Sequence, residues 1–110
     1  MTDEERARVR ADFAASVNME AEELADWLET AESHSVGFRR PGESESVGHK
    51  AGRRIVGILG LSRFELEDED YRLMRKAVGF IRRHRAQEPA NMVTSRWRYA
   101  LMNWGHDPLK

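Results

Sequence analysis

The apolar positions of the chain recur with helical spacing, most clearly from Ser46 to Leu59. Placed on a helix at about 100° per residue, this stretch separates into two faces. The apolar arc contains Ala51, Ile55, Ile58, Leu59 and, toward one edge, Val56; the opposite side carries His49, Lys50, Arg53 and Arg54, with Gly57 among them. The pattern predicts a helix, capped by Ser46 and ending near Gly60, that buries one face and presents positive charge on the other.

Similar patterns predict four further helices. A thin apolar stripe covers residues 3–16, a compact Leu24/Trp27/Leu28 anchor covers 18–30, and Trp97, Leu101 and Trp104 form a seam in a last helix that Ser95 or Thr94 caps. Residues 68–86 carry the broadest apolar half, which is typical of a central core helix. No strand-like alternation interrupts them. We therefore expect an all-α fold, with the 110 residues forming a single compact domain of about five helices.

Residues 31–45 form the main loop of this prediction, because Ser, Gly, Pro and charged residues replace the apolar pattern there. The loop is longer than most helix connections, so it is either functional or an ordinary flexible connector. Arg39 and Arg40 within it would extend a basic surface. Shorter connectors are predicted at 60–66 and 87–93.

The charge of the chain is unevenly distributed, although the formal net charge is only −1. Residues 1–48 contain 12 Asp/Glu and 5 Lys/Arg, a balance of −7, whereas residues 49–110 contain 7 acidic and 13 basic residues, a balance of +6. Two interpretations follow: the two halves pair with each other in the fold, or the basic half contacts an anionic partner.

The basic helix faces make DNA the candidate partner. Phosphate neutralisation needs several Lys or Arg side chains on one surface. The candidate contacts are His49, Lys50, Arg53 and Arg54 on the helix that follows Ser46, and Arg72, Arg75, Lys76, Arg82 and Arg83 on the helix over 68–86. These two faces form one patch only if they lie side by side. The connector at 60–66 is long for a helix-turn-helix motif, so we expect backbone contact with little sequence readout.

Gly57 and Gly79 lie within the two basic faces. Glycine inside a helix costs about 1 kcal/mol relative to alanine, so its presence calls for a reason. Two reasons compete: close approach of a phosphate backbone, or close packing of another helix.

Catalytic and metal-binding patterns are absent from the sequence. It has no cysteine, which excludes disulfides and thiolate zinc sites, and His34, His49, His84 and His106 show no paired metal-ligand spacing. His84 is expected to be a core histidine, while His106-Asp107 is either a structural cap or a ligand or acid–base pair. We predict no enzyme, no catalytic residue, no metal and no cofactor. No apolar run reaches the roughly 18 to 20 residues of a membrane span, so we expect a cytoplasmic protein that makes no membrane contact.

Four stretches resemble a family of short uncharacterised bacterial proteins with fungal relatives, commonly labelled DNA-binding protein or domain of unknown function. The resemblance is carried by Val17–Met19 leading to Trp27–Thr30, by Glu45–Val56, by Met74–Gly79, and by Trp97–Pro108 with the sequence WRYALMNWGHDP. It implies DNA binding and carries no catalytic residues over to this chain.

The alternative, from another functional class, is a non-enzymatic protein-interaction or oligomerisation module. In that interpretation the acidic N-terminal half, or the Trp97/Trp104 seam, docks a protein partner or a second copy. Exposed tryptophans would favour it, whereas buried ones would indicate core packing alone.

Overall fold

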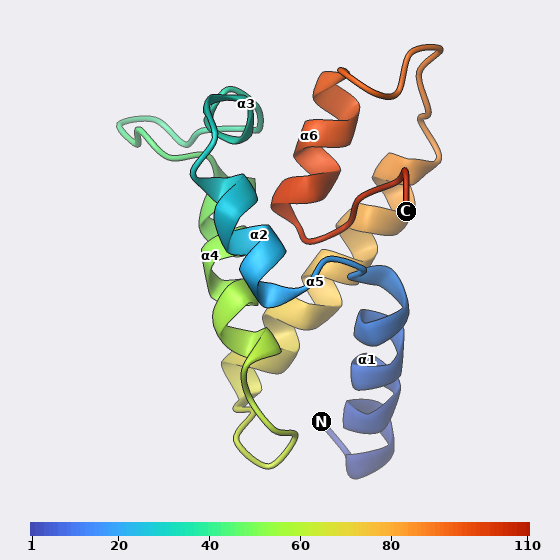
Figure 1. The fold of residues 1–110 in the computed structure, drawn as a ribbon. Helices are drawn as coiled ribbons and strands as arrows, with labels where there is room; N and C mark the ends of the chain where they lie inside the picture. The colour runs from blue at the N-terminus through green and yellow to red at the C-terminus, as the bar shows by residue number, and fades with distance from the viewer.

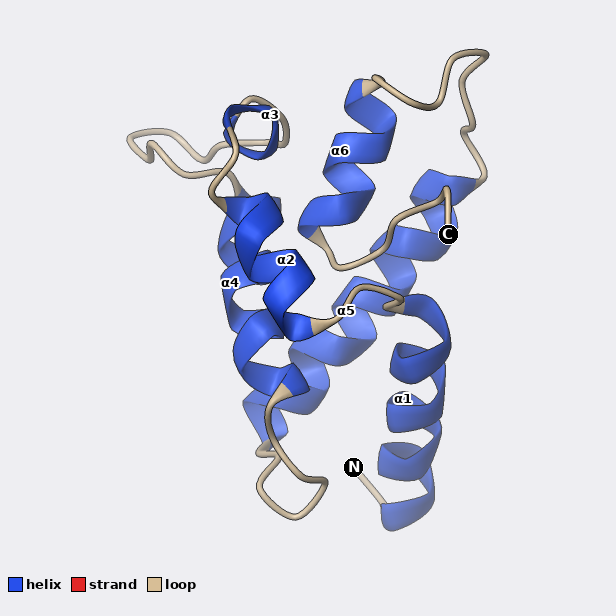
Figure 2. Ribbon diagram, viewed as in Figure 1, coloured by secondary structure: helices blue, strands red, loops and turns tan.

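Two helices begin at the capping residues that the sequence predicts, Ser46 and Ser95. In the computed structural model, which describes all residues 1–110, the side chains of Thr2, Ser46 and Ser95 each accept a hydrogen bond from the backbone N–H three residues later. The fold is all-α, as predicted, with no strands (Figures 1 and 2). Its helices are α1 (Asp3–Ser16), α2 (Ala21–Leu28), α3 (Ala31–His34), α4 (Val47–Leu59), α5 (Asp68–Arg85) and α6 (Arg96–Asn103). None of them is long and apolar enough to cross a membrane.

The longest helix, α5, is the centre of the arrangement. It contacts α1, α4 and α6, while α2 packs along α4 (Figure 1). The residues predicted for its apolar half are buried, with Tyr71 and Ala77 at its core and Phe80 half-buried. Ile55 of α4 and Leu101 of α6 are completely buried beside them. Each such side chain contributes about 1.5–3 kcal/mol by leaving water, so the apolar faces hold the helices together.

Two glycines of α4 allow its close approach to α2 and α6. A Cβ atom at Gly52 would lie 2.3 Å from the backbone oxygen of Asn103 and 2.8 Å from Leu28 Cδ2. At Gly48 it would lie 2.9 Å from Nε1 of Trp104. These distances leave no room for a methyl group, so Gly48 and Gly52 are the glycines at which helices pack.

The region from Asn18 to His34 differs from the prediction of one helix followed by a loop. Glu20, which makes a capping box with Glu23, starts α2, and the helix ends at Leu28. Thr30 then accepts a hydrogen bond from the Ser33 N–H and starts the short helix α3 inside the predicted main loop. Ser33 is buried and its hydroxyl contacts Asn103 Oδ1 at 2.6 Å, so α3 is tied to α6.

The segment after α6 closes against the turn between α1 and α2. Gly105 takes a positive φ of 87°, and its carbonyl accepts the N–H groups of Asn18 and Met19. The Asn18 side chain bonds both the N–H and the carbonyl of Asp107, at 2.8 and 2.9 Å. Asp107 also receives Arg98 Nε and Nη2, each at 3.2 Å. The predicted structural role of His106-Asp107 therefore fits its surroundings.

His106 is a buried and fully hydrogen-bonded member of the same segment. Its Nδ1 lies 2.6 Å from the Ser16 carbonyl and its Nε2 lies 2.9 Å from Arg85 Nη1. Because a carbonyl only accepts and a guanidinium only donates, the imidazole is neutral with its proton on Nδ1. Burial, reinforced by the charge of Arg85, lowers the pKa of His106.

Candidate functional site

His49, the first of the predicted contact residues, is not part of an open basic surface. Its side chain is buried, with 5% of the residue exposed. The ring Nε2 faces the Leu28 carbonyl at 2.7 Å and Nδ1 faces Glu45 Oε2 at 2.5 Å. The prediction that His49 belongs to the charged face was wrong, because the last carbonyl of α2 needs a hydrogen-bond donor at this point.

Arg53 is exposed, but its charge is directed to a carboxylate of the chain itself. Its Nε and Nη2 donate to the two oxygens of Glu45 at 2.8 and 2.6 Å, a bidentate arrangement. These hydrogen bonds from Arg53, together with the contact to His49, lower the pKa of Glu45 to about 2. Arg53 and His49 thus bind Glu45 at the start of α4 and do not form part of an open basic surface.

The basic residues of α5 divide between two directions. At about 100° per residue, Arg72, Lys76 and Arg83 fall on one line together with Gly79, whereas Arg75 and Arg82 are rotated by about 60–80° from it. The rotated pair faces the acidic residues of α1: Arg82 lies 3.4 Å from Asp12 and Arg75 lies 4.0 Å from Glu5. Arg83 Nη1 lies over Gly79.

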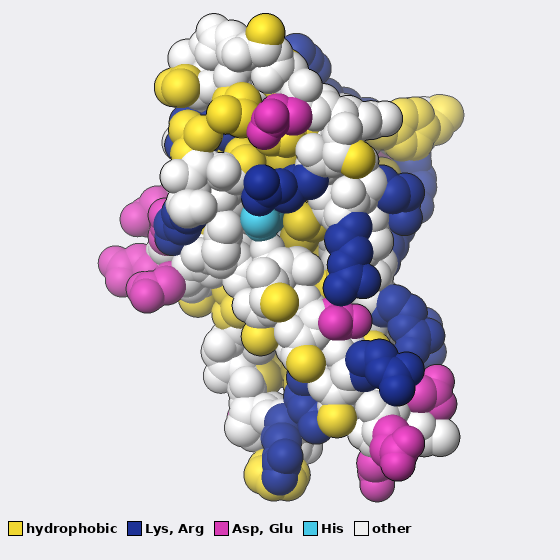
Figure 3. All heavy atoms as spheres, turned by 90° about the vertical axis from the view of Figure 1, so that its right-hand side faces the viewer, with side chains coloured by type: hydrophobic (Ala, Val, Ile, Leu, Met, Phe, Trp, Pro, Cys, Tyr) yellow, Lys and Arg dark blue, Asp and Glu magenta, His cyan; other side chains and the backbone are white.

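Figure 3 shows the side of the molecule that includes α1, where basic and acidic side chains are interspersed. Arg6 of α1 likewise pairs with Asp68 at 2.5 Å. The unequal charges of the two halves of the chain therefore compensate each other in part on this side, as one of the two interpretations predicted.

The other faces of α4 and α5 meet, and cations from both line a shared surface. Lys50, Arg54 and Lys76 line one hollow of about 180 Å³ together with Arg40 from the loop before α4. Arg54 and Lys76 also line an adjoining hollow of about 370 Å³ with Arg72. We call this surface the α4–α5 cationic groove, made of Arg40, Lys50, Arg54, Arg72 and Lys76.

Most cations of the α4–α5 cationic groove have no acidic partner. Arg54 is the exception, with Asp70 at 4.0 Å; the remaining four make no ion pair within the chain. Two carboxylates, Glu43 and Glu69, also line the hollows. Five cations against three carboxylates, Asp70 included, leave a net positive surface.

Of the two loop arginines, only Arg40 reaches the α4–α5 cationic groove. Arg39 folds back on its own loop, where its guanidinium donates to the carbonyls of Ser44 and His34. The sequence placed Arg40 beside a basic surface but could not distinguish it from Arg39, because their positions depend on the path of the loop.

Gly57 and Gly79 do not pack against another helix. A Cβ atom at Gly57 would meet nothing within 4 Å, and one at Gly79 would meet only the Arg83 guanidinium, at 3.0 Å. The helix-packing explanation is therefore wrong for both: the face at Gly57 is open, whereas the Arg83 guanidinium covers Gly79.

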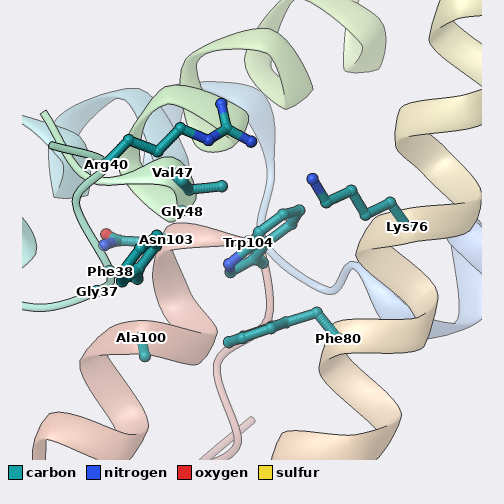
Figure 4. A pocket seen from close by; sticks show the side chains of 10 residues that line it. All are labelled: Gly37, Phe38, Arg40, Val47, Gly48, Lys76, Phe80, Ala100, Asn103 and Trp104. Carbon is teal, nitrogen blue, oxygen red and sulfur yellow. The ribbon is translucent and has the colours of Figure 1, made fainter. Parts of the chain in front are cut away.

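An apolar pocket adjoins the α4–α5 cationic groove and was not predicted. We call it the aromatic pocket; its volume is about 280 Å³ and its apolar walls are Phe38, Val47, Phe80, Ala100 and Trp104. Figure 4 shows Arg40 and Lys76 on the side of the pocket where Trp104 lies. Phe38 belongs to a loop without periodicity, so no sequence signal distinguished it.

The predicted Trp97/Trp104 seam belongs to the core, since the two residues are only 8% and 5% exposed. It belongs to a ladder of stacked rings in which His84 lies between Trp97 and Phe80, and Phe80 also stacks on Trp104. Burial lowers the pKa of His84, but the residue is half-buried and its Nε2 has no hydrogen-bond partner, so it is not the core histidine that was predicted. The seam therefore packs in the core, and its tryptophans reach the surface only as parts of the walls of hollows.

The fold and this surface together define a small all-α protein with a positively charged groove beside an aromatic pocket. No group of three or more His, Asp or Glu side chains is placed to hold a metal ion. Residues 12–102 match a family described as a protein of unknown function, DUF3140, and the chain belongs to that family. No curated protein and no solved structure matches it.

Proposed function

We propose that the chain is a nucleic-acid-binding protein that contacts the phosphate backbone through the α4–α5 cationic groove. The observation that carries this proposal is the convergence of cations from two helices and a loop on adjoining hollows. Four of these cations, namely Arg40, Lys50, Arg72 and Lys76, have no acidic partner in the chain. Uncompensated charge on an exposed concave surface favours an anionic ligand.

The proposed contact surface is smaller than the set of residues predicted from the sequence. Lys50, Arg54, Arg72 and Lys76 remain in it, and Arg40 joins them. His49 and Arg53 hold Glu45, whereas Arg75 and Arg82 face α1. Backbone contact also suits Gly57, because a residue without a side chain on an open helix face lets a phosphate approach the backbone closely.

Salt dependence gives the proposal a quantitative form. Each phosphate neutralised on duplex DNA contributes about −0.9 to the slope of log K against log salt, so four or five contacts give a slope of about −4. Binding is measured by fluorescence anisotropy of a labelled DNA at about 50 mM and about 200 mM salt. A slope near zero, or no binding at the lower salt concentration, contradicts the proposal.

A matched pair of double variants locates the surface. Lys50→Ala with Lys76→Ala removes two charges from the α4–α5 cationic groove, and Arg75→Ala with Arg82→Ala removes two charges from the side facing α1. The first should weaken binding by about tenfold or more and reduce the salt slope by about 2, while the second should change both only slightly. Equal weakening by both pairs would show that net charge, and not the groove, determines binding.

Self-association is a second candidate function, favoured by one exposed aromatic residue. Phe64, in the connector between α4 and α5, is 84% exposed, and the guanidinium of its neighbour Arg63 lies 4.8 Å from the ring centroid. Leu61 beside it is also exposed. Sedimentation velocity of the wild type and Phe64→Ser tests this function: a dimer that the substitution dissociates supports it, and a monomeric wild type at high concentration refutes it.

A further inference from the structure

We propose that the aromatic pocket receives one unstacked base of a single-stranded nucleic acid whose neighbouring phosphates lie in the α4–α5 cationic groove. This inference rests on the proposed function and specifies its ligand. Single-strand binding generally combines a basic channel for the backbone with aromatic side chains on which bases stack, and this surface places both elements side by side.

Phe38 provides the stacking surface, because it is a large aromatic residue that the fold holds in place yet leaves 71% exposed. Its carbonyl accepts the Val47 N–H at 2.8 Å, which attaches the loop to the first residue of α4. The preceding Gly37 has a φ of +96°, and an added Cβ would lie 3.0 Å from Ser46. The ring is therefore presented from a fixed backbone rather than from a free loop.

Two residues of the pocket wall, Asn103 and Trp104, carry side-chain groups that could donate a hydrogen bond to a ligand. The Asn103 amide is engaged by the fold: Oδ1 accepts from Trp27 Nε1 at 2.7 Å and from the Ser33 hydroxyl, and one Nδ2 proton is donated to the Ser33 carbonyl. Trp104 Nε1 makes no hydrogen bond within the chain, and Figure 4 shows it on the side of the ring that faces Phe38 and Asn103. A free indole donor beside an open aromatic ring suits a flat ligand that carries acceptors at its edge, as every nucleobase does.

The aromatic pocket and the α4–α5 cationic groove share part of their walls. Arg40, Val47, Lys76 and Trp104 line both, and in Figure 4 the Lys76 ammonium group lies beside the Trp104 ring. A ligand with an aromatic part in the pocket would therefore have its adjoining part among the cations. A purely apolar ligand would leave those charges unused, whereas a nucleotide unit, which joins a flat base to a phosphate, uses both.

The same geometry predicts tighter binding of single strands than of duplexes. Bases in a duplex are paired and stacked, and removing one costs a few kcal/mol, whereas the bases of a single strand are free to enter a pocket. The protein should therefore bind an oligothymidylate more tightly than a duplex of the same length at the same salt concentration.

Four labelled ligands test the inference by anisotropy: a DNA single strand, the RNA strand of the same sequence, the duplex, and an abasic strand that keeps the phosphates without the bases. Phe38→Ala should weaken binding to the single strands about 5- to 150-fold, which corresponds to about 1–3 kcal/mol for one stacked base. It should leave the abasic strand unaffected. Val93→Ala, which trims an exposed apolar side chain that lines neither the aromatic pocket nor the α4–α5 cationic groove, is the control and should change nothing.

The outcomes distinguish this inference from the proposed function. Tighter binding of the DNA or the RNA strand than of the duplex, lost with Phe38→Ala, supports it, and comparison of the two strands shows which one is preferred. Duplex binding as tight as single-strand binding, or a Phe38→Ala loss that is equal on the abasic strand, overturns it while phosphate binding by the groove stands. Absence of binding to all four ligands overturns both.

Discussion

Gly52→Ala and Gly57→Ala place the same methyl group on two positions of α4, and we expect opposite effects on stability. At Gly52 the new Cβ would lie 2.3 Å from a backbone oxygen of α6 and 2.8 Å from the Leu28 side chain. At Gly57 it would meet nothing within 4 Å. Both variants gain the same intrinsic preference of alanine for a helix, so the difference between them isolates the contact between helices.

The expected magnitudes follow from these distances. Overpacking a close contact costs about 1–3 kcal/mol, and here the nearest atom belongs to backbone, which moves only if α4 and α6 separate. Because a backbone contact at 2.3 Å calls for the upper end of that range and alanine returns about 1 kcal/mol of helix preference, Gly52→Ala should lower the free energy of unfolding by about 2 kcal/mol. Gly57→Ala should raise it by about 0.5–1 kcal/mol.

Urea denaturation followed by far-UV circular dichroism measures both changes. Thermal unfolding gives a second measurement, because a change of 1 kcal/mol moves the melting temperature of a chain of this size by about 4 °C. Gly52→Ala should therefore melt below the wild type and Gly57→Ala above it. A Gly52→Ala protein as stable as the wild type would refute the packing argument. Destabilisation by Gly57→Ala would refute the claim that its face is open.

Three further predictions concern single polar groups. Burial lowers the pKa values of His84 and His106. Below about pH 6.5 the unfolded chain therefore binds more protons than the folded one, and the free energy of unfolding should fall as the pH falls through that value. Equal urea midpoints at about pH 7.5 and about pH 5.5 would contradict this. Glu45→Gln should cost about 1 kcal/mol at neutral pH through loss of the Arg53 pair. Since the pKa of Glu45 is held at about 2, that difference from the wild type should be complete above pH 4.5 and disappear as the pH falls toward 2; a difference that does not vary with pH would argue against the ion pair. Asn103→Ala should cost about 3 kcal/mol in thermal unfolding because it leaves buried donors and acceptors unpaired, and a loss below about 1 kcal/mol would show that water replaces the amide.

Helix positions could be predicted closely because they depend on local information. Ser46 and Gly60 enclose α4 as expected, and Glu67 starts α5 with its capping box. The short helix α3 was missed, since four residues carry too little periodicity to be recognised and its capping residue, Thr30, lies inside the helix that was predicted there.

The candidate site was only partly predictable, because its composition depends on contacts between distant segments. A helical wheel places His49 among the cations, and nothing local reveals that the Leu28 carbonyl, 21 residues earlier, faces its ring. Likewise, the glycines at which helices pack are Gly48 and Gly52, whereas the sequence pattern raised that possibility for Gly57 and Gly79. A helical wheel gives the orientation of each residue about the axis of its own helix. Which of these faces is buried depends on where another helix crosses it.

The pairing of Asn18 with Asp107, 89 residues apart, has a consequence for synthesis of the chain. During translation the turn between α1 and α2 is made early, but its partners at Gly105 and Asp107 leave the ribosome almost a full chain later. We therefore expect α1 to dock on α5 once that helix emerges, and the turn between α1 and α2 to be fixed only when Gly105 and Asp107 follow. The turn is thus fixed late, although its own residues are made early.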